Sequence, residues 1–151
     1  MPSQWPSGRP RLIVVTLETT ELSLPSRIET VEKAATVVAD FVGRSGISEE
    51  AAYGIDMAVR EAVTNAVVHG NQEDERKVVE LTLKSLPEAV EITIQDRGQG
   101  FNPEEVPDPT EAENILKTSG RGIFFMRTFM DEVTWSIRPD GGTTVRMLKR
   151  R

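Results

Sequence analysis

Three polar residues that could do chemistry recur at helical spacing in one segment of the chain. Glu61, Asn65 and His69 are four residues apart, which on an α-helix places them in one stripe about 80° wide. A carboxylate can accept a proton, and a side-chain amide oxygen can ligate a hard cation such as Mg²⁺. A solvated helix face is the simpler interpretation, but such a face is usually rich in lysine. The stripe is therefore a candidate site for proton transfer beside a metal ion.

A second candidate is Asp96, at the end of a predicted strand. It has the same parity as Ile92 and Ile94, so we expect its side chain to face the buried side of the sheet. A buried carboxylate needs partners. It could accept backbone N–H groups in a strand-end turn. It could also accept the exocyclic amine of an adenine, with Gly98 and Gly100 letting the ring approach the backbone.

Glycine-rich segments occur at two further places. The sequence Ser-Gly-Arg-Gly at 119–122 precedes a predicted helix, where glycines expose backbone N–H groups to an anion and the helix dipole assists. The sequence Gly-Thr-Thr at 142–144 opens the last predicted strand and on its own is typical of a hairpin turn. A P-loop is absent from the sequence. The dinucleotide-binding pattern is also absent, because Phe125 stands where its third glycine should be.

The elements expected around these residues form a two-layer fold. Apolar residues at helical spacing predict helices over 25–41, 48–70 and about 122–131. Alternating apolar and polar residues predict strands over 12–17, 79–84, 90–95, 133–137 and 144–149, the last two forming a hairpin. This order predicts an α/β two-layer sandwich, with a mixed, mostly antiparallel sheet covered on one face by three helices.

The domain organisation expected from this pattern is simple. Residues 1–11 read as a flexible N-terminal tail, and 12–149 as a single domain. Within that domain, 97–119 is rich in glycine, proline and acidic residues and is expected to be a lid.

The composition excludes several other chemistries. The chain has 151 residues with no cysteine and one histidine, so disulfides, thiol nucleophiles, cysteine-bearing zinc sites and three-histidine metal sites are impossible within it. Its net charge of −6 argues against direct binding of nucleic acid, which depends on lysine and arginine. The sequence holds neither a membrane-length apolar run nor a signal peptide. We therefore expect a cytoplasmic protein without a membrane partner.

The candidate segments, taken in order, resemble the N, G1, G2 and G3 boxes of an ATP-binding superfamily. They read EAVTNAVVHG at 61–70, DRGQGF at 96–101, GRGIFFM at 120–126 and GTT at 142–144. This superfamily includes gyrase, the Hsp90 chaperone, histidine kinases and MutL. Within it, the chain resembles the anti-sigma factor serine/threonine kinases of bacterial partner switching. That group shares the single small domain, the short lid and a similar sequence over 122–133.

The resemblance implies a Bergerat-type sandwich that binds MgATP. It implies that Asn65 ligates Mg²⁺, that Asp96 holds the adenine and that Thr144 supports the adenine end of the site. It implies that Glu61 is the general base that takes a proton from a serine or threonine hydroxyl. The lid and phosphate site would be shaped by Gly98, Gly100, Gly120 and Gly122. Two further cofactor-binding residues are implied, Arg121 as a phosphate contact and His69 at the family's usual histidine position.

The same resemblance implies partners. Members of that family sequester a sigma factor and phosphorylate a small antagonist protein, the anti-anti-sigma factor. The resemblance also implies that this chain forms a homodimer. The alternatives are a non-catalytic ATP-binding regulator that sequesters a partner, a histidine-kinase-like ATPase domain, and a clamp of the gyrase or MutL kind that uses Glu61 to activate water. Glu61 is the residue that discriminates among them, because only some of these proteins need a carboxylate there.

Overall fold

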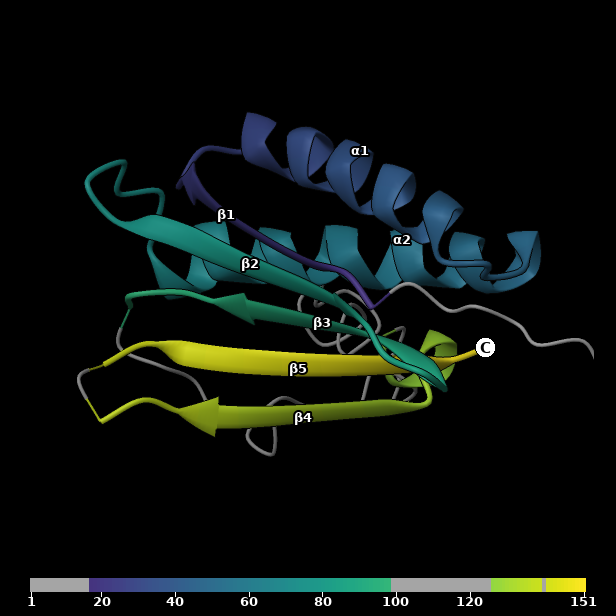
Figure 1. Cartoon of the computed structure of the whole chain (residues 1–151). Coiled ribbons are helices and arrows are strands. Elements are labelled where there is room, and N and C mark those ends of the chain that lie inside the picture. Colours follow the sequence, from purple (N-terminus) through teal and green to yellow (C-terminus); the bar gives the residue numbers. More distant parts are fainter. Residues whose placement is uncertain (1–16, 99–125, 140) are drawn as a thin grey trace, which may run out of the picture.

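The structure is a five-stranded sheet with helices on one face, as Figure 1 shows. It is a computed structural model that describes residues 17–98, 126–139 and 141–151. The strands are β1 (Thr19–Pro25), β2 (Val78–Ser85), β3 (Ala89–Gln95), β4 (Glu132–Ile137) and β5 (Thr143–Arg150). Their order is β1-β2-β3-β5-β4, and each pairing is antiparallel. The expected α/β two-layer sandwich is confirmed, and its described strands form an antiparallel sheet rather than a mixed one.

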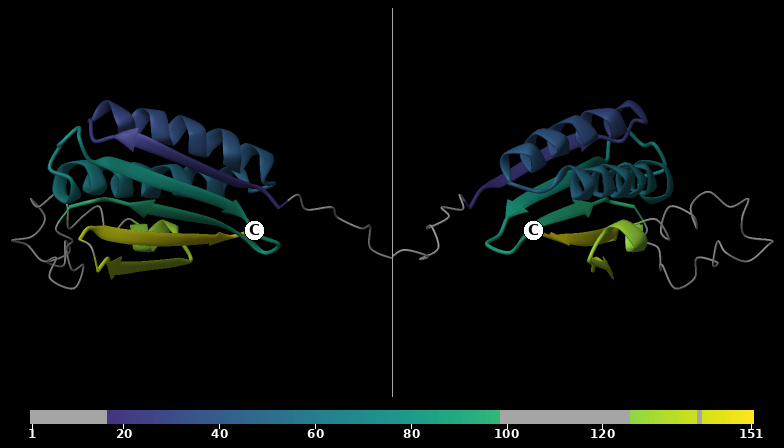
Figure 2. Two further views of the ribbon diagram at one scale, coloured as in Figure 1. Left: turned by 60° about the vertical axis from the view of Figure 1, so that its left-hand side comes forward. Right: turned by 90° about the vertical axis from the view of Figure 1, so that its right-hand side faces the viewer.

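The helical layer consists of α1 (Glu29–Arg44), α2 (Glu49–Thr64) and a π-helical segment, η1 (Asn65–Gly70), that continues α2. Figures 1 and 2 show α1 and α2 side by side over the same face of the sheet. The side chain of Ser48 accepts a hydrogen bond from the backbone N–H of Ala51, which caps α2 where the sequence predicts its start. The expected helix over 48–70 is therefore present, and its last six residues are π-helical.

The core lies between the two layers. The alternating apolar residues of the strands point at the helices, and the apolar faces of α1 and α2 point back. Its largest fully buried side chains are Phe41, Ile55, Leu81, Leu83, Ile92, Ile94, Met126 and Met147. Polar and charged residues alternate with them on the other face of the sheet.

The first strand and the first helix differ from the expectation. The predicted strand over 12–17 lies outside the described residues except for Leu17, which is exposed and in no strand. The observed β1 begins at Thr19, and its Leu22 pairs with Leu81 of β2. Leu22 and Leu24 supply the inward side chains of this short strand, and Pro25 ends it. For that reason α1 begins at Glu29 rather than at Pro25.

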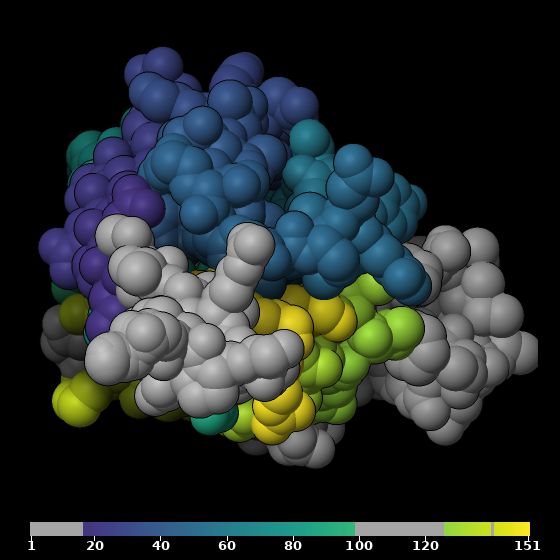
Figure 3. All heavy atoms as spheres, turned by 45° about the vertical axis from the view of Figure 1, so that its right-hand side comes forward, coloured from purple at the N-terminus to yellow at the C-terminus, as the bar shows by residue number. Residues whose placement is uncertain are grey.

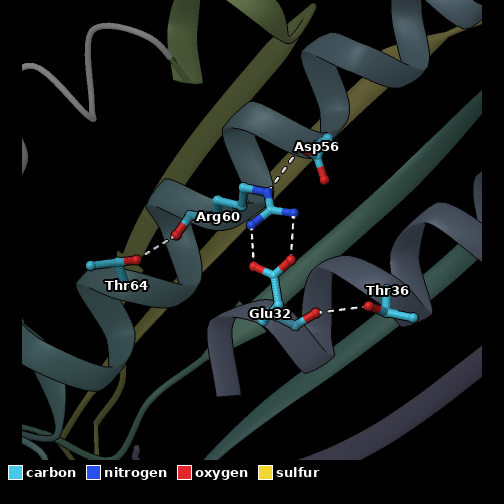
Figure 4. Close-up of polar contacts among 5 residues, drawn as sticks. All are labelled: Glu32, Thr36, Asp56, Arg60 and Thr64. Atoms are coloured by element: carbon cyan, nitrogen blue, oxygen red, sulfur yellow. Dashed lines mark hydrogen bonds and ion pairs between the residues drawn. The ribbon is translucent and has the colours of Figure 1, made fainter. Parts of the chain in front are cut away.

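An ion-pair cluster joins the two long helices (Figure 4). Arg60 of α2 donates to Asp56 one turn earlier, at 2.9 Å, and its two terminal nitrogens pair with both carboxylate oxygens of Glu32 on α1. Both carboxylates raise the pKa of Arg60, Glu32 by the stronger hydrogen bond, and Arg60 in turn lowers the pKa of Glu32. The cluster links α1 to the part of α2 that carries Glu61.

A helical turn over 126–129 packs against the start of α2. In the space-filling view of Figure 3, the green turn lies between α2 and the yellow end of β5. The ring of Phe129 meets Tyr53 edge to face, with the ring centroids 6.3 Å apart. Lys149 of β5 donates to the carbonyl of Phe129 at 2.8 Å. Residues 122–125 of the expected third helix lie outside the described residues, as do 99–119 of the expected lid and the expected tail.

None of the helices within these described ranges has both the length and the apolar character that a membrane crossing needs.

Candidate functional site

The end of α2 and the start of η1 present the first two candidate residues to the edge of the sheet. Asn65 is 5% exposed, and its side-chain nitrogen is buried with no hydrogen-bond partner among the described residues. Glu61 is half-buried, and burial raises the pKa of its carboxyl group. No hydrogen bond or ion pair joins Glu61 to another described residue. An unpartnered amide and an unpartnered carboxylate on one helical face favour a ligand there.

His69 lies four residues after Asn65 and differs from it in burial. It is exposed to solvent, whereas Asn65 points into the protein. The backbone between these two residues is π-helical, and the N–H of Asn71 bonds to the carbonyl of Ala66, five residues back.

Asp96 directly follows β3 and lies on the buried side, as its parity predicts, at 3% exposed. Its Oδ1 accepts the backbone N–H of Gly98 and that of Thr143, both at 3.0 Å. Burial raises the pKa of Asp96, and the two N–H groups oppose that effect. Oδ2 receives no hydrogen bond from any described residue. The strand-end turn therefore accounts for one carboxylate oxygen and leaves the other as an acceptor for a donor from outside.

Three glycines hold this carboxylate against the helix. A Cβ at Gly70 would lie 2.3 Å from Oδ2 of Asp96, and one at Gly98 would lie 1.7 Å from the carbonyl oxygen of Gly70. Gly142 has a φ of +94°, and a Cβ there would lie 2.2 Å from the carbonyl oxygen of Asp96. The expected role of Gly98 was to admit a ring to the backbone. The structure gives a further reason for this glycine, which is the contact between the end of β3 and the end of η1.

Asn65 and Asp96 line one pocket between the helices and the sheet. Its other walls are Ala62, Ala66, Ile94, Met126, Trp135, Thr143 and Val145. These walls are apolar apart from Thr143 and suit a flat, largely apolar group with a polar edge. The free space in this pocket is only about 10 Å³ in volume, so a purine ring requires the lining side chains to move. Met126 is unbranched and adapts readily to such a change.

The sequence analysis missed one residue of this pocket and misplaced another. Thr143 is 3% exposed and is bonded to Asp96 through both its N–H and its carbonyl. Thr144 is on the opposite face of β5, where it pairs with Gln95 and Ser136. The signal was available, because Thr143 shares the parity of Val145 and the other inward residues of that strand. The remaining candidates, Gly100, Gly120, Arg121 and Gly122, lie outside the described residues.

The described part of the chain fits one protein ligand for Mg²⁺ rather than a cage. It holds no group of three histidine, cysteine or acidic side chains that could bind a metal ion. Mg²⁺ commonly takes one or two protein oxygens and completes its shell with phosphate and water. The unpartnered amide of Asn65 suits that role, since a half turn about its last torsion exchanges the nitrogen and the oxygen.

Comparison with known proteins agrees with this geometry. Residues 24–149 match the family model of the histidine kinase-like ATPase domain. The anti-sigma F factor of Clostridium perfringens is 36% identical over 119 residues, which cover 78% of this chain and 85% of that protein. The anti-sigma F factor of Bacillus subtilis is 35% identical over 120 residues, covering 77% and 81%. The serine-protein kinase RsbW of Oceanobacillus iheyensis is 30% identical over 119 residues, covering 75% of each.

A solved structure shares the fold. The chain matches the crystal structure of the RsbU and RsbW domains of a Mycobacterium tuberculosis protein with a TM-score of 0.63 and 18% identity. The match covers 88% of this chain and 32% of that one. The chain therefore belongs to the histidine kinase-like ATPase family and, within it, to the anti-sigma factor serine/threonine kinases that its four sequence segments resemble.

Proposed function

We propose that this protein is an anti-sigma factor that binds MgATP and phosphorylates a serine or threonine of an antagonist protein. The observation that carries the proposal is the pocket that Asn65 and Asp96 share, in which each offers an unpartnered polar atom between apolar walls. Adenine has this character, with two apolar faces and an amine at one edge. The names of the relatives support serine phosphorylation as the class of reaction and a sigma factor as the class of partner.

The polar residues of the pocket and one neighbouring glycine have separate roles in this proposal. Oδ2 of Asp96 accepts the exocyclic amine of adenine, while Thr143 holds Oδ1. Asn65 supplies an oxygen to Mg²⁺, whose charge, when bound, offsets that of the phosphates. Gly98 supports the pocket by its contact with Gly70. The expected shaping of the lid and phosphate site by Gly100, Gly120 and Gly122 belongs to this proposal, as do the phosphate contact of Arg121 and the cofactor-binding role of His69.

Glu61 is the proposed general base. It lies one helical turn before Asn65, and burial raises the pKa of its carboxyl group towards the working pH. The carboxylate takes the proton from the hydroxyl of the incoming serine or threonine as that oxygen bonds to phosphorus. The proton moves to Glu61, and the bond from phosphorus to the leaving oxygen of ADP breaks. Phosphoryl transfer depends mainly on positioning and charge neutralisation, so one base and one metal ligand suffice on the protein side.

The partners in this proposal follow the relatives. We infer that the chain sequesters a sigma factor, recognises a small antagonist domain, and works in the cytoplasm as a homodimer. The support is the sequence similarity to anti-sigma F factors over about three quarters of the chain.

The test is a transfer assay with γ-labelled MgATP and an antagonist-type domain encoded nearby. We expect Glu61→Gln to lower transfer by about 100-fold or more and to leave the dissociation constant for ATP within a few-fold. The control is Glu50→Gln, which removes an exposed carboxylate in the first turn of the same helix. Release of free phosphate without labelled protein would indicate an ATPase clamp. Binding without turnover would indicate a non-catalytic regulator. Equal loss of nucleotide binding and transfer in Glu61→Gln would contradict the assigned role.

A further inference from the structure

Asn71 lies directly after η1 and is fully buried. Its backbone N–H closes the last π-helical turn on the carbonyl of Ala66. A buried asparagine at a helix end needs partners for its whole side-chain amide. In this structure the partners are Ser26, Val78 and Arg97, of which the first and last are distant in the sequence.

Both the nitrogen and the oxygen of the Asn71 side-chain amide form hydrogen bonds. Its nitrogen donates to the hydroxyl of Ser26, at 2.8 Å, and to the carbonyl of Val78, at 3.1 Å. Its oxygen accepts the backbone N–H of Arg97, at 2.7 Å. The nitrogen thus ties the end of η1 to the corner after β1 and to the start of β2. The oxygen reaches the residue that follows Asp96.

The bond to Arg97 orients the peptide that leaves Asp96. The next N–H along the chain, that of Gly98, is one of the two donors to Oδ1 of Asp96. Moving the Asp96–Arg97 peptide therefore moves a donor that sets the rotation of the carboxylate. Gly70 lies close against Oδ2, since a Cβ at that glycine would overlap this oxygen. A rotation of the carboxylate group changes the direction in which Oδ2 points.

We propose that Asn71 is a positioning residue that aims the free oxygen of Asp96 and so sets the preference of the pocket for 6-aminopurines. This inference rests on the proposed function, because it needs a nucleotide whose base meets Asp96. Asn71 touches no nucleotide in this proposal. It acts through the peptide N–H groups of Arg97 and Gly98.

The selectivity of the pocket for the 6-amino group distinguishes a positioning role of Asn71 from a role in the stability of the fold alone. Inosine triphosphate carries a carbonyl where adenosine triphosphate carries the amine, so it opposes an acceptor to Oδ2. Calorimetry of the full chain with each nucleotide and Mg²⁺ gives the ratio of the two dissociation constants. We expect the wild type to prefer ATP by at least about tenfold, the value of one hydrogen bond to a charged group.

Three variants separate the bonds made by the amide nitrogen of Asn71 from the bond made by its oxygen. Asn71→Ala removes all three hydrogen bonds and should bring the ratio to within about threefold of unity. Ser26→Ala removes one partner of the nitrogen and leaves the bond to Arg97. It should lower the melting temperature with the ratio within about twofold of the wild type. Asn71→Asp keeps an acceptor for Arg97 and should recover most of the ratio despite its own loss of stability. If Asn71→Ala does not fold, the ratio of dissociation constants is measured in Asn71→Asp instead.

The outcomes separate this inference from the proposed function. A wild type that binds neither nucleotide overturns both. A wild type that binds ATP and inosine triphosphate equally overturns the contact with the amine, and this inference with it. A selective wild type with an equally selective Asn71→Ala leaves the proposed function standing and shows that Asn71 has a structural role alone.

Discussion

Replacing Asp96 by asparagine keeps the shape of the pocket and changes one oxygen into a nitrogen. The asparagine oxygen can still accept the N–H groups of Gly98 and Thr143, which bond to Oδ1 in the wild type. The new amide nitrogen then faces the adenine amine, so a donor meets a donor. A hydrogen bond to a charged acceptor contributes about 1.5–3 kcal/mol. The dissociation constant for ATP should therefore rise by roughly 10- to 150-fold.

The folded state of the same variant should become more stable, although its affinity for ATP falls. Burial raises the pKa of Asp96 above its ordinary value of 3.8 in the folded state. The folded protein therefore holds this proton more tightly than the unfolded chain does. As the pH rises from below 3.8 through the folded pKa, the wild type loses stability that the variant does not lose. Asp96→Asn should consequently be at least as stable as the wild type at neutral pH.

The assay is chemical denaturation across the acid-to-neutral range, combined with nucleotide titration by calorimetry. The control is Asp40→Asn, which changes an exposed carboxylate on α1. The difference in unfolding free energy between variant and wild type should grow with pH and then level off. Unchanged affinity for ATP in Asp96→Asn would refute the nucleotide contact. A difference that shrinks as the pH rises would refute the argument from burial.

Two further predictions concern the scaffold of the site. Gly98→Ala should destabilise the protein by about 3 kcal/mol or more in urea denaturation, because its Cβ would overlap the carbonyl oxygen of Gly70. Gly43→Ala, in α1 with open space around it, should instead stabilise by up to about 1 kcal/mol, and equal effects would contradict the close contact. Glu32→Gln should lower the melting temperature only slightly, since the pair with Arg60 is exposed, and high salt should abolish the difference.

The sequence predicted the parts of the fold that depend on a simple period. Ile55, Val59 and Ala62 recur at helical spacing, and all three are buried in α2. Asp96 follows the alternation of β3 into the buried layer, as expected. These predictions hold because a helix or a strand that packs on one side must repeat its apolar residues with its own period.

The errors occur where a local feature interrupts the period. The change from α-helix to π-helix after Thr64 was not expected, and nothing in the residue types marks it. Thr143 and Thr144 are chemically alike, so only the register of β5 shows which of them faces Asp96. The role of Asn71 depends on three segments far apart in the chain, and no spacing in the sequence could indicate it.

The wall that β4 contributes to the pocket contains an indole ring. Trp135 lines the same space as Asn65 and Asp96, and the guanidinium carbon of Arg127 lies 5.1 Å from the centroid of its ring. Indole emission responds to the water and the charge around the ring, so a purine that enters the pocket changes the fluorescence of this residue. Trp5 is the only other tryptophan in the sequence, and Trp5→Phe leaves Trp135 as the single emitter. We therefore expect the emission of Trp135 to report nucleotide binding in this pocket without an added label.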